Sequence, residues 1–334
     1  MKTALLGLEE QPFGLRGAAF GLEEHPPSAD LRPQAKRSLS EALTIRYGLF
    51  AMHSIDDLIE IALKEDIGPA DITTDNLVGP ELEGVGVTIA KEGLVIAGLE
   101  IAKRVFQSLD PEVIYKSGFK DGDTLEKGGT IFQVSGKLCA LLKGERTALN
   151  FLQRLSGIAT NVRFYVDKLG ENTVRLVDTR KTTPGLRFLE KYAVRVGGAF
   201  NHRMGLYDGV LIKDNHIAAC GGITTSVERI RNKISHLVKV EVEVSTIDEV
   251  KEAIAAGADV IMLDNMSIKR IKESVALIGG RAIVEVSGGV TKDNFLRLAD
   301  IGVDLISVGA FTHSARSMDI SMRINTTTQL TGSN

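Results

Sequence analysis

Short apolar runs alternate with amphipathic segments through the second half of the chain. Six runs have the length and the β-branched residues that are typical of strands buried on both faces: Val174–Val177, Gly209–Ile212, Val238–Val244, Val260–Leu263, Ala282–Val286 and Leu305–Val308. The last four runs are separated by segments whose apolar residues have helical spacing: Ile247–Ala256, Ile268–Ile278 and Asn294–Ile301. The pattern predicts strands and helices in alternation.

Polar or glycine residues close the last four runs at a nearly constant interval. Glu243, Asp264, Ser287 and Gly309 follow one another at 21 to 23 residues, which is typical of a repeated strand–helix unit with short loops. Such units form a parallel sheet that can close into a (β/α) barrel, and six visible strands predict either an incomplete barrel or one that borrows an element the pattern does not reveal. An open doubly wound sheet is the alternative, although no strand is followed by the dinucleotide fingerprint G-x-G-x-x-G.

The region before the barrel has a different pattern. Residues 52–140 predict a small N-terminal α+β domain, opened by a capping-box signal at Ser54-Ile55-Asp56-Asp57. Its expected elements are strands at Val85–Ile89, Leu94–Ala97, Val113–Tyr115 and Thr130–Val134 and a helix at Leu99–Leu109. Residues 141–169 predict connecting helices, with a break near Ser156-Gly157 left open, and residues 170–334 form the predicted barrel. Arg154 and Arg163 are expected on a solvent-exposed helix face.

Residues 1–51 lack a helical or strand period. They hold four of the chain's eight prolines and a near-repeat, GLEEQP and GLEEHP. This composition predicts a disordered and dispensable extension, with Met52 as a natural start. The alternatives are a segment that orders on a partner subunit and a targeting segment, although Glu9, Glu10, Glu23 and Glu24 weaken the latter.

Composition excludes several classes of protein. The net charge of −3 and the absence of Trp argue against a nucleic-acid-binding protein. No apolar run approaches the length of a membrane span. Cys139 and Cys220 are far apart and not in metal-binding spacing, which favours a reducing compartment, so that a cytoplasmic enzyme is expected.

Charged residues gather where the predicted strands end, above all between Asp178 and His216. This stretch has seven Lys or Arg residues against four acids. The carboxyl ends of barrel strands meet at one face, and ligands bind there. Because Arg and Lys bind carboxylate and phosphate oxygens, the sequence predicts a small anionic ligand, held by Thr179, Arg180, Lys181, Arg203 and Lys213.

Several of these positions have a structural alternative. Lys213 could form an internal ion pair, Asp264 could cap the following helix, and His202 could be a core histidine. Glu241 and Glu243 share one face of a strand, so that one or both point into the barrel, where a carboxylate needs a cation or hydrogen-bond donors.

Glycines close the last two strands. At Ser287-Gly288-Gly289 and Gly309-Ala310 the backbone N–H groups can approach a phosphate closely, as the final loops of (β/α) barrels often do. The predicted face therefore combines cations, carboxylates and a phosphate cradle.

At this point the motifs carry a resemblance. The stretch DTRKTTPGLRFLEKYAVRVGGAFNHRMGLYDGVLIKDNHI, followed in order by VEVEV, VIMLDNM, VEVSGGV and ISVGAFTHS, closely resembles the quinolinate phosphoribosyltransferase family over residues 52–325. The resemblance implies a sandwich domain with an incomplete α/β barrel, assembled as a homodimer or a multiple of one. It also implies a Mg²⁺-dependent transfer from 5-phosphoribosyl 1-pyrophosphate to quinolinate, with loss of pyrophosphate and CO₂, to give nicotinate mononucleotide for NAD synthesis.

The resemblance further implies roles for single residues. Lys181, Lys213, Glu243 and Asp264 are expected to be catalytic, with Glu243 and Asp264 holding the ribose hydroxyls and Mg²⁺. Arg146 is expected to reach into the neighbouring subunit's site. The expected substrate-binding residues are Arg146, Thr179, Arg180, Lys181, His202, Arg203, Lys213, Glu243, Asp264, Ser287, Gly288, Gly289, Gly309, Ala310 and Phe311. The alternatives are a nicotinate phosphoribosyltransferase, another phosphate-binding barrel and a metabolite sensor.

Overall fold

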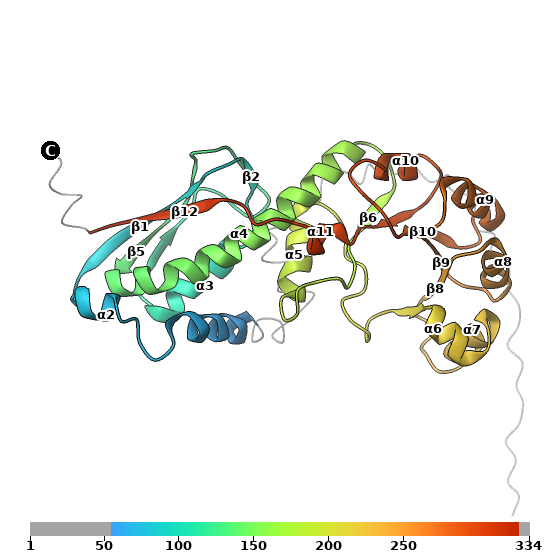
Figure 1. The fold of residues 1–334 in the computed structure, drawn as a ribbon, viewed down its shortest axis with the longest axis horizontal. Coiled ribbons are helices and arrows are strands. Elements are labelled where there is room, and N and C mark those ends of the chain that lie inside the picture. The colour runs from blue at the N-terminus through green and yellow to red at the C-terminus, as the bar shows by residue number, and fades with distance from the viewer. Residues whose placement is uncertain (1–54, 327–334) are drawn as a thin grey trace, which may run out of the picture. The chain divides into compact units, whose positions relative to one another are not determined.

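The computed structural model describes residues 55–326 of the 334-residue chain (Figure 1). The predicted extension 1–51 lies outside the described residues, so its expected disorder stays a prediction. The described part opens with a helix over residues 55–67, where the capping-box signal predicted one. A one-turn helix, α2 (Thr74–Leu77), follows it.

An antiparallel sheet with the strand order β12-β1-β5-β3 forms the first layer. Its strands are β1 (Glu83–Ala90), β3 (Ile114–Lys116), β5 (Thr130–Lys137) and β12 (Ile320–Thr326), and a separate pair is formed by β2 (Leu94–Val95) and β4 (Thr124–Leu125). Alternate residues of β1 are buried, as expected for a sheet that is covered on one face. Helix α3 (Leu99–Leu109), which has the predicted bounds, contacts the sheet through Phe106, whose ring meets Phe132 edge-on.

Strand β12 comes from the opposite end of the chain. It runs antiparallel to β1, from Gly84 paired with Thr326 to Ala90 paired with Ile320, and Figure 1 shows the red strand beside β1. Its position in the sequence groups these residues with the barrel, but they complete the first sheet instead. The physical reason is that β1 needs a hydrogen-bonding partner along the edge that β5 does not cover.

Helix α4 (Leu138–Leu169) is a single unbroken helix of 32 residues. A break near Ser156-Gly157 does not occur. Gly157 serves a close approach, because a Cβ at this position would lie 1.9 Å from the backbone oxygen of Arg316. The glycine therefore marks where the chain leading into β12 crosses the helix.

Two arginines of α4 are not on a solvent-exposed face. Arg154 donates to Glu190, which is completely buried, and to the carbonyl oxygens of Thr312 and Ala315, each at 2.7 Å. Arg163 Nε donates to the carbonyl oxygen of Gly197 at 3.0 Å. Both expectations were wrong because the spacing of charges along a helix does not reveal that a second helix covers that face.

The second sheet contains six parallel strands in the order β6-β11-β10-β9-β8-β7. The strands are β6 (Arg175–Val177), β7 (Val210–Ile212), β8 (Val240–Val244), β9 (Val260–Asp264), β10 (Ile283–Ser287) and β11 (Leu305–Ser307). From β7 to β11 each strand neighbours the next in sequence, and β6 lies beside β11. A doubly wound sheet would reverse its order at an internal strand. The observed order, with β6 and β7 at the two edges and not paired with each other, is that of the expected incomplete barrel.

Helices surround this sheet. They are α5 (Arg187–Gly197), α6 (Asp214–Cys220), α7 (Ile223–Arg231), α8 (Ile247–Ala255), α9 (Ile268–Ile278), α10 (Phe295–Ala299) and α11 (Ala310–His313). In Figure 1, α8 and α9 lie outside the strands β8–β10, and each packs on the strand before or after it. The last three predicted helices are confirmed within two residues at each end. Among residues 55–326, no helix has both the length and the apolar character needed to cross a bilayer.

Candidate active site

The loop after β6 brings the first cations to the carboxyl ends of the strands. Arg180 and Lys181 are both exposed there, and Lys181 N–H donates to Thr179 Oγ1 at 3.1 Å. Thr312 Oγ1 donates to the carbonyl oxygen of Lys181 at 2.8 Å, and a Cβ at Gly309 would lie 3.2 Å from Lys181 Cδ. The structure therefore places this loop against the end of β11, although the two are far apart in sequence.

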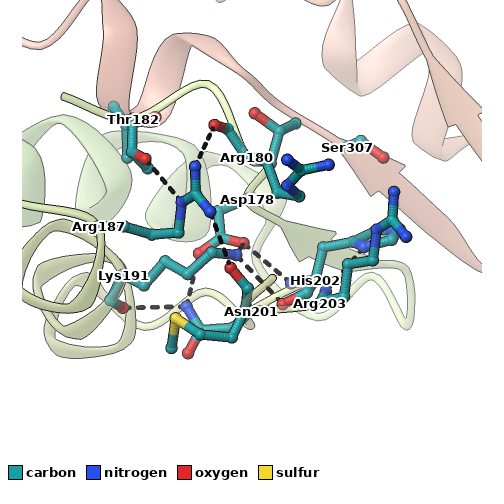
Figure 2. Close-up of polar contacts among 12 residues, drawn as sticks. Asp178, Arg180, Thr182, Arg187, Lys191, Asn201, His202, Arg203 and Ser307 are labelled. Carbon is teal, nitrogen blue, oxygen red and sulfur yellow. Dashed lines mark hydrogen bonds and ion pairs between the residues drawn. The ribbon is translucent and has the colours of Figure 1, made fainter. Parts of the chain in front are cut away.

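A buried ion pair supports this loop from below. Asp178 and Lys191 of α5 are both completely buried and form a salt bridge, which Figure 2 shows at the centre of the site. Asp178 also accepts from the backbone N–H of His202 at 2.9 Å and from Asn201 Nδ2 at 2.6 Å. Burial raises the pKa of Asp178 and lowers that of Lys191, while the charge of each partner opposes the shift.

These supporting residues were missed in the sequence. The available signal was the position of Glu190 and Lys191, two charged residues beside Leu189 and Ala193 on the apolar face of α5. Charges on a buried face need partners, and Lys191 finds Asp178 while Glu190 finds Arg154.

His202 and Arg203 follow on the segment that leads to β7. His202 Nε2 points into the barrel and lies 3.1 Å from Glu241 Oε2. The ring therefore has the orientation of a core histidine, which was the alternative considered from the sequence. Burial alone would lower the pKa of His202, but the hydrogen bond and charge of Glu241, with the charge of Glu285, leave that pKa above its ordinary value. Arg203 Nη1 donates to the carbonyl oxygen of Gly209 at 3.0 Å. Burial and the nearby charge of Arg180 lower the pKa of Arg203, which indicates that the two arginines share one region.

The two predicted catalytic carboxylates differ in their surroundings. Glu243, at the end of β8, forms a salt bridge with Lys213, which is the internal ion pair considered from the sequence. Asp264, at the end of β9, is half-buried and accepts from Asn265 Nδ2 at 2.8 Å. Asp264 does not cap the next helix, because Ser267 is the N-cap residue of α9.

Close backbone contacts shape the ends of β9 and β10. Asn265 N–H donates to the carbonyl oxygen of Ser287 at 3.0 Å, and a Cβ at Gly288 would lie 2.3 Å from Asn265 Oδ1. Gly288 and Gly289 have φ values of 86° and 61°, which a residue with a side chain rarely adopts. These glycines therefore allow a conformation that exposes backbone groups at the barrel mouth.

The last predicted phosphate contacts lie after β11. Gly309 precedes α11, and the carbonyl oxygen of Ala310 accepts from Asn161 Nδ2 at 3.1 Å. Phe311 is fully buried, its ring meets Tyr165 edge-on, and its backbone N–H donates to the carbonyl oxygen of Val308 at 3.3 Å, so the structure does not present Phe311 to a ligand.

Arg146 is the predicted site residue that the structure does not bring to the other members. It is exposed on α4, and within residues 55–326 no hydrogen bond or ion pair holds its guanidinium. The remaining members meet at one end of the parallel sheet, which gives a mouth with several cations, two carboxylates and glycine-rich backbone.

Comparison with known proteins agrees with this architecture. Residues 71–156 match the quinolinate phosphoribosyl transferase N-terminal domain, and residues 158–323 match the C-terminal domain of the same family. The chain belongs to the quinolinate phosphoribosyltransferase family. The family's two domains meet within α4, which explains why one helix contacts the strands of the first domain and the barrel helix α5.

Members of the family from bacteria and plants are similar to this chain. A probable nicotinate-nucleotide pyrophosphorylase [carboxylating] of Bacillus subtilis is 47% identical over 78% of this chain and 90% of its own length. The chloroplastic enzyme of that name from Arabidopsis thaliana is 39% identical over 82% of this chain and 84% of its own. The crystal structure of NadC from Streptococcus pyogenes superposes with a TM-score of 0.79 at 43% identity, covering 82% of this chain and 97% of that protein.

Proposed function

We propose that this protein transfers a phosphoribosyl group from 5-phosphoribosyl 1-pyrophosphate to quinolinate and releases pyrophosphate and CO₂, to give nicotinate mononucleotide for NAD synthesis. The observation that carries the proposal is the match to both family domains along one chain, on a barrel whose strand ends gather the expected residues. The bacterial and plant relatives, which are 47% and 39% identical to this chain, support the proposal because they are named for this activity.

The cations of the barrel mouth suit the two substrates. Quinolinate has two carboxylates, and Arg180 lies close enough to Arg203 that its charge, together with burial, lowers the pKa of Arg203. Arginine binds carboxylates bidentately, so we assign this pair, with Thr179, to quinolinate. We assign Lys181 and Lys213 to the phosphates of the second substrate, whose 5-phosphate would meet the backbone of Ser287–Gly289 and of Gly309 and Ala310.

The carboxylates fit a magnesium ion. Mg²⁺ prefers oxygen ligands and is commonly held by one or two carboxylates together with substrate phosphates. Glu243 and Asp264 close neighbouring strands, and each is only partly buried. We propose that these two residues and the oxygens of the substrate hold Mg²⁺, which would neutralise the pyrophosphate as it leaves.

The reaction requires little covalent chemistry from the protein. The quinolinate nitrogen forms a bond to the ribose carbon while the bond from that carbon to pyrophosphate breaks. Glu243 and Asp264 would stabilise the positive charge that develops on the ribose. The ribosylated ring nitrogen then accepts the electrons released when the 2-carboxylate leaves as CO₂, and a proton from water completes the ring carbon. Positioning and charge complementarity are therefore the main work of the site.

One assay tests the proposal directly. The full chain is incubated with quinolinate, 5-phosphoribosyl 1-pyrophosphate and Mg²⁺, and nicotinate mononucleotide and CO₂ are both measured. We expect the two products in equal amounts and no product when nicotinate replaces quinolinate. Product from nicotinate without CO₂ would identify a nicotinate phosphoribosyltransferase instead. Binding of the pyrophosphate substrate without any turnover would favour a sensor.

We further propose a cytoplasmic homodimer with shared active sites. The free thiols of Cys139 and Cys220 are compatible with a reducing compartment. Arg146 supports the shared site, because an exposed arginine without a partner in the described part of its own chain is available to an anion bound by a second copy.

A further inference from the structure

The barrel interior contains a polar cluster below the strand-end cations. Glu241 of β8 and Glu285 of β10 are at least nine-tenths buried, and a carboxylate oxygen of one lies within 4.8 Å of a carboxylate oxygen of the other. Ser307 Oγ donates to Glu285, and His202 Nε2 lies 3.1 Å from Glu241 and 3.6 Å from Glu285. Glu241 Oε1 has no hydrogen-bond partner among residues 55–326. The roles assigned above do not use either glutamate.

The backbone next to His202 fixes which ring nitrogen carries a hydrogen. The N–H of Arg203 donates to His202 Nδ1 at 2.7 Å, so Nδ1 must offer a lone pair. The hydrogen of the imidazole is then on Nε2, where it faces the two carboxyl groups. Burial favours the neutral ring, whereas the hydrogen bond with Glu241 and the charges of Glu241 and Glu285 raise the pKa of His202 and favour the charged ring. A charged imidazole, however, would direct a second hydrogen at the Arg203 N–H, so the backbone contact selects the neutral ring. The proton that the cluster can hold therefore belongs to the carboxyl pair, and burial with the charge of Glu241 raises the pKa of Glu285 to about 7.

The same side chains resemble a metal site in their spacing alone. One ligand atom from each of His202, Glu241 and Glu285 lies within 4.8 Å of the others. A histidine binds a metal through an unprotonated nitrogen. Because the Arg203 contact places the hydrogen on Nε2, that nitrogen has no lone pair for a cation. The geometry favours a hydrogen-bond network over a metal centre.

Arg203 links this network to the barrel mouth. Its backbone is held by His202, and its guanidinium is held by the carbonyl oxygen of Gly209. Burial and the charge of Arg180 lower the pKa of Arg203, while the charge of Glu241 acts in the opposite direction and raises it. Both carboxyl groups thus face the imidazole of His202, and the charge of Glu241 also acts on the guanidinium of the next residue.

We propose that Glu241 and Glu285 are positioning residues, which accept the Nε2–H of a neutral His202 and thereby hold Arg203 in place for a carboxylate of quinolinate. The inference rests on the proposed function, because it takes Arg203 as a ligand of that substrate. With one proton between them, Glu241 and Glu285 keep a single negative charge, which is enough to hold His202. Two negative charges would repel the carboxylates of quinolinate bound above them.

Kinetics of two Glu285 variants test the positioning role. Glu285→Leu removes the acceptor, whereas Glu285→Gln keeps the shape and hydrogen bonds of a protonated carboxyl group. Met262→Leu is the matched control, because Met262 is buried in register with Glu285 on the adjacent strand. We expect Glu285→Leu to raise the KM for quinolinate about tenfold, with kcat and the other KM within threefold, because positioning of a binding group affects uniform binding. Glu285→Gln and Met262→Leu should stay within threefold of the wild type.

Contrary kinetic results would overturn the inference. If Glu285→Leu lowers kcat and raises both KM values together, its role is structural. If Glu285→Gln loses as much as Glu285→Leu, a protonated carboxyl group is not what the site uses.

A spectroscopic measurement separates this inference from the proposed function, because it needs no turnover. Nuclear magnetic resonance of ¹⁵N-histidine-labelled protein reports the tautomer of each ring, and His202→Gln identifies the signal of His202. We expect a neutral ring with its hydrogen on Nε2. A charged imidazolium, or stoichiometric Zn²⁺ binding that Glu285→Gln abolishes, would overturn the network. Absence of any quinolinate turnover by the wild type would instead remove the proposed function, while the tautomer would still decide the network.

Discussion

At the residue scale, the two lysines of the barrel mouth are in different states. Lys181 is exposed, and no ion pair engages its ammonium group within residues 55–326. Lys213 already has a partner, because its ammonium group pairs with Glu243. An anionic substrate can therefore meet Lys181 directly, whereas Lys213 must exchange or share Glu243. The sequence pattern places both lysines after a strand and gives no sign of this difference.

Loss of a single cation should reduce activity without unfolding the protein. We expect Lys181→Ala and Arg203→Ala each to lower kcat/KM at least about tenfold, because a charge-assisted hydrogen bond contributes about 1.5–3 kcal/mol. Lys251→Ala is the control, since Lys251 is an exposed lysine of α8 that pairs only with Asp248. Turnover and the thermal midpoint are measured for all three variants. Near-normal turnover of either site variant would contradict the assignment.

Glu285 should give stability a distinct pH dependence. Burial and the charge of Glu241 raise its pKa from 4.5 to about 7 in the folded protein. The folded chain thus holds this proton more tightly than the unfolded chain, so the stabilisation is present below pH 4.5 and is lost as the pH rises toward 7. We expect the wild type to lose about 3 kcal/mol relative to Glu285→Gln over this interval. Urea unfolding at both ends of the interval measures it, and parallel curves would contradict the shift.

At the element scale, α4 is the helix that packs against both domains. It contacts β1, β2, β5 and β12 of the first domain and packs along α5 of the barrel. The side chain of Arg154 fastens α4 to Glu190 and to the segment that leads into β12. One helix can serve both domains because its small residues permit close approach, with Gly144 against Phe106 and Gly157 against Arg316.

A side chain at position 157 should disturb this crossing. In Gly157→Ala the new Cβ would lie 1.9 Å from a backbone oxygen, which cannot move aside as a flexible side chain can. We expect a loss of about 2 kcal/mol or more in the free energy of unfolding, despite the better helix propensity of alanine. The control is Gly279→Ala, at the left-handed C-cap of α9, where a Cβ would meet no atom closer than 3.5 Å and the loss should be only about 1 kcal/mol for the positive φ. Equal losses would show that the crossing has room.

At the scale of the whole molecule, the last strand joins the first sheet and the barrel stays open. β12 returns to the first sheet, while β6 and β7 remain without a hydrogen-bonded connection to each other. Arg146 lies on α4 and faces no anionic partner within the described part of the chain. If Arg146 acts in its neighbour's site, a second copy of the chain would bind the anion that Arg146 contacts.

Complementation between two inactive variants tests that assembly. One preparation contains Arg146→Ala and the other Lys181→Ala, each inactive by expectation. In a mixed dimer one site keeps both wild-type side chains, so we expect mixing to restore up to about one quarter of the activity, given random exchange and additive sites. Mass spectrometry confirms that mixed dimers form. If they form and no activity returns, Arg146 does not act across subunits.

The sequence by itself determined the strands of the barrel and the edge of the sheet at which the candidate site residues lie. Buried parallel strands need continuous apolar residues, so β6 to β11 stand out from their surroundings, and a repeated period places Glu243, Asp264 and Ser287 at equivalent strand ends. The specific motif from Asp178 onward then identified the family, which the domain matches confirm.

The tertiary structure alone decided which residues face one another. Periodicity cannot show that α5 covers Arg154, that β12 leaves the barrel for β1, or that Asp178 meets Lys191. Each of these contacts satisfies a buried charge or an open strand edge with a group distant in sequence. Local pattern reports only that a residue needs a partner, whereas the choice of partner depends on how the whole chain packs.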